Sequence, residues 1–63
     1  METNELKVGD RVQLHPATDA WMSGDRYGQV VHIPSRSRLI QVLMDRSNKV
    51  RRVHATNILE VVS

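Results

Sequence analysis

Short stretches in which apolar and polar residues alternate recur along this chain of 63 residues. In the first, Val12 and Leu14 alternate with Arg11 and Gln13, a pattern that predicts a half-buried strand. Branched residues between turn-forming neighbours predict four more strands. The five expected strands cover residues 11–15, 27–33, 38–44, 49–54 and 58–62.

The segment from Trp21 to Ile33 organises this pattern. Gly24 and Gly28 allow backbone conformations that a side chain forbids, so we expect tight turning there before the second strand. Residues 17–26 are expected to form a long loop. With one helical turn expected after the fourth strand, the sequence predicts an all-β fold, a small five-stranded barrel with a long first loop and a single helical turn before the last strand.

Two of the expected strands bear on function. Residues 38–44 are apolar on both faces, which indicates a central strand or one whose outer residues Leu39 and Leu43 are covered by a partner. In the next strand the adjacent Arg51 and Arg52 must point to opposite faces. One of them is therefore expected to face the barrel or its rim.

Length and composition indicate a single small domain. We expect residues 1–5 to form a flexible arm and residues 6–63 to form the domain. The chain has no cysteine, so a disulfide or thiolate site is excluded. No apolar run approaches the roughly 20 residues that span a bilayer, and the acidic start is unlike a signal peptide. A soluble, cytoplasmic protein is the expectation.

The charge is distributed unevenly, although the net charge is only +2. Residues 1–25 sum to −3, whereas residues 26–54 sum to +6. A basic surface of this kind can meet phosphates or an acidic protein, and a normally solvated surface is the alternative interpretation.

The basic segment supplies the candidate contacts to RNA or DNA. Its cations could meet backbone phosphates, and Tyr27 or Trp21 offers a ring for stacking. Because the chain has only one Trp, one Tyr and no Phe, such binding would be mainly electrostatic. The candidate nucleic-acid-binding residues are Arg26, Tyr27, Arg36, Arg38, Arg46, Lys49, Arg51 and Arg52.

These residues also have structural interpretations. Trp21 could cap the core instead of presenting a ring to a ligand. For at least one of the two adjacent arginines we expect an ion pair with Asp45 or Asp25. A second functional hypothesis is a protein-interaction or assembly module, self-association included, with contacts through Trp21, Leu39 and Leu43.

The sequence contains no recognisable catalytic or metal-binding constellation. His15, His32 and His54 are separated by 17 and 22 residues, which matches no local metal motif. The serines have no recognisable nucleophile setting. We therefore expect a non-enzymatic protein with no cofactor, no metal and no membrane partner.

One set of residues spans nearly the whole chain after residue 6 and carries a family resemblance. These residues are Gly9, Asp10, Arg11, Val12, Gly24, Gly28, Val30, Ile33, Arg38, Leu39, Val42, Ile58, Leu59, Glu60 and Val61. In them the chain resembles the SH3-like barrels, and among these the KOW-type barrels of ribosomal proteins and transcription elongation factors. That resemblance implies a small barrel that binds nucleic acid or a ribonucleoprotein surface.

Two other resemblances imply different roles. The stretch Trp21-x-x-Gly24-Asp25-x-x-Gly28 is similar to the peripheral SH3-like subunit of photosystem I, which implies docking within an assembly. The Gly9-Asp10-Arg11-Val12 start is similar to type II dihydrofolate reductases, but the Val-Gln-Ile-Tyr stretch of that family's pore is absent. Nucleic-acid binding is the leading hypothesis, and protein interaction is the second.

Overall fold

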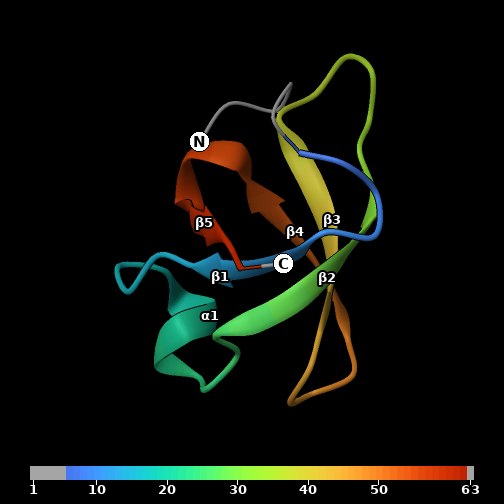
Figure 1. The fold of residues 1–63 in the computed structure, drawn as a ribbon. Coiled ribbons are helices and arrows are strands. Elements are labelled where there is room, and N and C mark those ends of the chain that lie inside the picture. Colours follow the sequence, from blue (N-terminus) through green and yellow to red (C-terminus); the bar gives the residue numbers. More distant parts are fainter. Residues whose placement is uncertain (1–5, 63) are drawn as a thin grey trace.

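The computed structural model describes residues 6–62 and shows a sheet of five strands. The expected arm at residues 1–5 lies outside the described residues. A four-residue helix lies within the first long connection, and a 3-10 turn precedes the last strand (Figure 1). The elements are β1 (Arg11–Leu14), α1 (Asp19–Met22), β2 (Tyr27–His32), β3 (Leu39–Met44), β4 (Val50–His54), η2 (Ala55–Asn57) and β5 (Ile58–Val61).

The strands pair in the order β4-β3-β2-β1-β5, and every neighbouring pair is antiparallel. The sheet curls around its core, with β4 and β5 as its two edges (Figure 1). This arrangement confirms the prediction of a small all-β fold with five strands. Within residues 6–62 no hydrogen-bonded pairing joins β4 to β5, so the described sheet keeps two edges.

Each strand is one residue shorter than the sequence predicted. Proline follows the first two of the excluded positions, and it removes a backbone donor and restricts the residue before it. Of the other three, Arg38 and Lys49 lie where the chain enters a strand from a turn, and Val62 follows β5 as the last described residue. The residues that fall outside the strands are His15, Ile33, Arg38, Lys49 and Val62.

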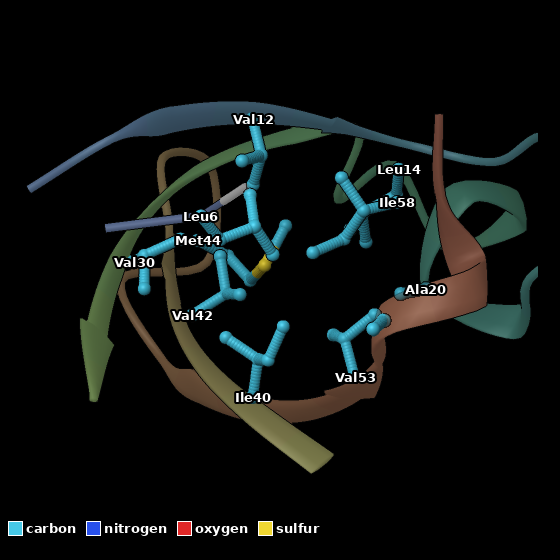
Figure 2. Packing of buried hydrophobic residues seen from close by; sticks show 11 residues of the cluster. Leu6, Val12, Leu14, Ala20, Val30, Ile40, Val42, Met44, Val53 and Ile58 are labelled. Carbon is cyan, nitrogen blue, oxygen red and sulfur yellow. The ribbon is translucent and has the colours of Figure 1, made fainter. Parts of the chain in front are cut away.

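Alternation along the strands sends one set of side chains into a common core (Figure 2). Leu14, Ile40 and Met44 are among the largest fully buried side chains, and burial of each contributes about 1.5–3 kcal/mol. On the opposite face of β3, Leu39 is 43% exposed and Leu43 is partly buried. The expectation that this strand is apolar on both faces is therefore confirmed.

The segment expected to be a plain loop contains α1. Its N-cap is Thr18, whose side-chain oxygen accepts a hydrogen bond from the Trp21 amide at 3.2 Å, and Asp19 lies in the first turn. Gly24, with φ +99°, follows the helix and confirms the expected tight turn. A helix of one turn is too short to show an apolar period, so the alternation pattern did not predict it.

Gly28 has a different role from the one expected of it. It lies inside β2, and its φ is outside the positive region that Gly9 and Gly24 occupy. A Cβ built on Gly28 would lie 2.5 Å from Cγ1 of Val42 and 2.7 Å from the carbonyl oxygen of Leu43. This glycine therefore serves close packing between β2 and β3 instead of a turn.

We expect Gly28→Ala to destabilise the protein by about 1–3 kcal/mol, because the added methyl must displace the β3 backbone or Val42. Urea denaturation measures the change in the free energy of unfolding. The adjacent and exposed Gln29 offers the control, since Gln29→Ala should change stability by less than about 0.5 kcal/mol. Equal stability of the two variants would refute the close-packing role.

Candidate binding surface

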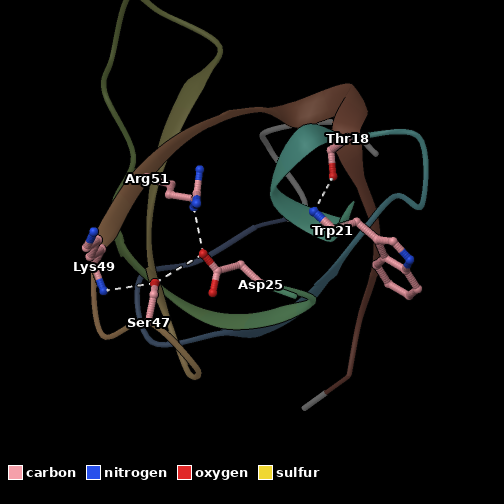
Figure 3. A network of polar contacts seen from close by, with 6 residues as sticks. All are labelled: Thr18, Trp21, Asp25, Ser47, Lys49 and Arg51. Carbon is pink, nitrogen blue, oxygen red and sulfur yellow. Dashed lines mark hydrogen bonds and ion pairs between the residues drawn. The ribbon is translucent and has the colours of Figure 1, made fainter. Parts of the chain in front are cut away.

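A buried carboxylate connects the α1 segment to β4 and to the turn between β3 and β4. The side chain of Asp25 is 3% exposed and accepts hydrogen bonds from Arg51 Nε at 2.8 Å and from Ser47 Oγ at 3.1 Å (Figure 3). Its own amide donates to the Ala20 carbonyl at 2.8 Å. The expected ion pair is thus confirmed for Arg51, with Asp25 as its partner.

The environment of this carboxylate favours its charged form. Burial acts most strongly and raises the pKa of Asp25, but the hydrogen bonds from Arg51 and Ser47 and the positive charge of Arg51 together lower it below the ordinary value of 3.8. Asp25 is therefore ionised at neutral pH. Its charge is balanced by a guanidinium whose side chain is 38% exposed.

Two further arginines pack against the α1 segment. The guanidinium carbon of Arg26 lies 4.8 Å from the centre of the Trp21 ring, a cation–π distance. Trp21 itself is partly buried and packs against the core, as the core-capping interpretation expects. Arg46 lies so close to Gly24 that a Cβ built there would be 2.6 Å from its Nη1.

The remaining cations lie along the β3–β4 hairpin and its entry. Arg36 and Arg38 precede β3, Arg52 lies on β4, and all three are exposed. Arg46 and Lys49, in the turn at the opposite end of the hairpin, are exposed as well. Among residues 6–62 none of these five forms an ion pair with a carboxylate.

Asp45, the one acidic residue of the basic segment, is also occupied. It pairs with Arg11, which comes from β1 and lies outside that segment. Because Asp45 pairs with Arg11, it does not neutralise any cation of the β3–β4 hairpin. Five of the seven expected cations therefore lie along one hairpin and its entry, while Arg51 pairs with Asp25 and Arg26 lies over the Trp21 ring.

An open cleft of about 520 Å³ separates α1 from β4. One wall is formed by residues 17–20 and the other by residues 51–54. Leu14 contributes apolar surface, and Leu39 and Asn57 complete the lining. The cleft therefore combines apolar surface with the two adjacent arginines of β4.

Two of the three histidines hold turns. Nδ1 of His15 accepts a hydrogen bond from the Ala17 amide at 3.1 Å, and Nδ1 of His54 accepts one from the Thr56 amide at 3.2 Å. These contacts give both imidazoles a structural role in a turn. Within the described residues no group of three or more His, Cys, Asp or Glu is placed to hold a metal ion.

The sequence did not indicate the α1 wall of this cleft. Thr18 and Asp19 belong to the expected loop, and Asn57 belongs to the expected helical turn. The signal that could have found the wall is the Thr18-Asp19 pair, which is typical of a helix start. Tyr27, 41% exposed at the start of β2, is absent from the lining, as are Trp21 and Leu43.

Comparison with protein-family models, with curated proteins and with solved structures gave no match. In the part of the chain that the structure covers, no helix has the length and apolar character needed to cross a membrane.

We expect Arg51→Ala to lower the free energy of unfolding by about 2 kcal/mol at neutral pH, because it leaves a buried carboxylate without its cation. Arg52→Ala removes the same side chain from the next position of β4, where it is exposed, and should cost less than about 0.5 kcal/mol. Chemical denaturation of both variants measures the difference, and equal losses would contradict the structural role of Arg51.

The cost of Arg51→Ala should depend on pH. The pKa of Asp25 in the folded protein lies below 3.8, so its ion pair contributes stability above that pH and loses it as the pH falls through the folded-state pKa. The difference between wild type and Arg51→Ala should therefore be largest at neutral pH and shrink below pH 3.8. Denaturation curves over this range measure it, and a difference that stays constant would exclude the linkage to Asp25.

Proposed function

We propose that this protein is a non-enzymatic binding module that contacts the phosphate backbone of RNA or DNA through its β3–β4 hairpin. The observation that carries the proposal is the strip of five exposed cations with no carboxylate partner among residues 6–62. Such groups are free to replace the counterions of a polyanion, which is the main source of non-specific affinity. The strip consists of Arg36, Arg38, Arg46, Lys49 and Arg52.

The shape of the strip fits a backbone better than a single phosphate. The six residues of β3 extend over about 20 Å, with arginines before the strand and Arg46 and Lys49 after it. Cations spread over that length can contact several phosphates of one strand. The resemblance to KOW-type barrels agrees with this role.

The aromatic residues offer little base recognition. The Trp21 ring lies against the core and beneath Arg26, which leaves Tyr27 as the exposed ring beside the hairpin. The backbone of Tyr27 contacts the β3–β4 turn, because its carbonyl accepts a hydrogen bond from the Asp45 amide at 3.0 Å. We therefore propose binding of low sequence preference, dominated by phosphate contacts.

Fluorescence anisotropy with a labelled single-stranded oligonucleotide tests this function. With four phosphate contacts the slope of log K against log salt should be about −3. Replacing Arg36, Arg38, Lys49 and Arg52 with alanine should abolish most of the affinity and flatten the slope. Arg51 is left intact, because its replacement would disturb the fold.

Lys7→Ala provides the matched control. Lys7 is exposed and lies before β1, outside the hairpin, so its removal changes the net charge by one without touching the strip. It should change affinity by less than about twofold, compared with the larger loss from any single strip residue. Affinity that is insensitive to salt, or that is retained when all four residues are replaced together, would overturn the proposal.

Self-association is the second candidate function, and an apolar pair on the outer face of the hairpin favours it. Leu43 lies opposite Val50 in the register of β3 and β4, and Val50 is 54% exposed. Leu39, 43% exposed, extends the apolar character of β3 toward its other end. A second copy of the chain that covers this face would bury these side chains.

If the outer face associates, Leu43→Arg should leave the fold intact and reduce the mass of the oligomer, because it places a charge in the contact. Sedimentation velocity measures the mass, and circular dichroism checks the fold. A wild-type protein that sediments as a monomer at high concentration would remove this candidate.

A further inference from the structure

The edge of the sheet at β4 has backbone groups that no strand uses. The Met44 amide donates to the Lys49 carbonyl at 2.9 Å, and the Ala55 amide donates to the Arg38 carbonyl at 3.0 Å. Lys49 and Ala55 are thus hydrogen-bonded positions, and such positions alternate along an antiparallel pair. The residues of β4 whose N–H and C=O groups point toward β3 are therefore those with odd numbers. The N–H and C=O of Arg52 therefore point away from β3.

Nothing in the described chain occupies these two groups. β4 is the last strand of the sheet, and its register with β3 leaves the amide and the carbonyl of Arg52 without a partner strand among residues 6–62. The free edge borders the cleft between β4 and α1. An open edge beside a cleft is the arrangement by which some domains add an extended peptide as an extra strand.

The dimensions of the cleft suit a short strand. Residues 51–54, which line it, extend over about 13 Å, enough for four residues of a peptide in extended conformation. The cleft volume of about 520 Å³ lies in the range typical of small binding sites. Its far wall, formed by residues 17–20, would flank the added strand.

The side chains along the edge indicate which peptide fits. Arg52 lies on the outer face without a carboxylate partner among residues 6–62, so an acidic residue directly opposite it would form a cross-strand pair. Val53 points to the inner face, where Leu14 and Ala20 also line the cleft, so the neighbouring peptide positions favour small apolar side chains. The exposed Asp19 on the far wall disfavours a second acid at those inner positions.

We propose that β4 accepts an acidic, extended segment of a partner protein as a sixth strand, with acidic and small apolar residues alternating along it. A second copy of the chain fits less well. Two β4 edges paired antiparallel about Arg52 would place like charges directly opposite each other, which is destabilising. This peptide site uses the backbone edge of β4, which the phosphate contacts proposed above do not use, and the two surfaces share the Arg52 side chain.

A synthetic peptide of alternating Glu and Val tests the proposal. Titration into ¹⁵N-labelled protein should shift the amide resonances of Arg52 and of the α1 wall, and hydrogen exchange of the Arg52 amide should slow by about tenfold in the complex. The same peptide with a single N-methyl group at its central residue should bind roughly fivefold more weakly, because it lacks the donor for the Arg52 carbonyl. Equal binding by both peptides would overturn strand addition.

Two variants at one position separate the backbone from the charge. Arg52→Pro removes the charge together with an amide that the fold does not use, and proline is tolerated on an edge strand with its missing donor turned outward, so the fold should persist. Arg52→Ala removes the charge and keeps the amide. Both should weaken binding, but only the effect of Arg52→Ala should disappear at high salt, while the loss caused by Arg52→Pro should persist.

Other occupants give distinguishable results. If an oligonucleotide slows hydrogen exchange of the Arg52 amide and the peptide does not, the occupant of this edge is nucleic acid and the proposal is overturned. Dimerisation of the free protein that Arg52→Pro abolishes would overturn it in favour of a second copy. Circular dichroism and thermal unfolding of each variant confirm that any loss of binding reflects the edge and not the fold.

Discussion

The ion pair between Asp25 and Arg51 determines how the long first connection is attached to the sheet. Its carboxylate lies in the chain just after α1, and its guanidinium comes from the second residue of β4, 26 positions away. Ser47 extends the contact to the β3–β4 turn. Three segments that are distant in the sequence are therefore held at one buried charge, and the position of the α1 wall depends on them.

This attachment assigns different roles to two adjacent arginines. Arg51 faces inward and is used for structure, while Arg52 faces outward and is available to a ligand. The difference follows from the alternation of a strand, since neighbouring side chains must point to opposite faces. A basic pair in the sequence thus corresponds to one structural cation and one exposed cation, so counting both charges overstates by one what this pair adds to the binding surface.

The strands were predictable because their physics is local. Alternation of Val12 and Leu14 with polar residues identifies β1 without knowledge of any other strand, and Pro16 and Pro34 bound the first two strands. The close approach at Gly28 was not predictable, since it depends on how β2 and β3 pack. The cleft was not predictable either, because it depends on contacts between distant segments. Its far wall is positioned by the contact of Asp25 with β4, and its near wall is open because β4 is an edge strand.

The cation–π contact at α1 has a consequence for spectroscopy. Trp21 is the single tryptophan of the chain, and it lies on the short helix and not on the sheet. Its indole is partly buried against the core with the Arg26 guanidinium beside it, so its emission responds to the seating of this helix. Far-ultraviolet dichroism, in contrast, is dominated by the five strands. The protein thus contains a natural optical label that separates detachment of one segment from melting of the whole sheet.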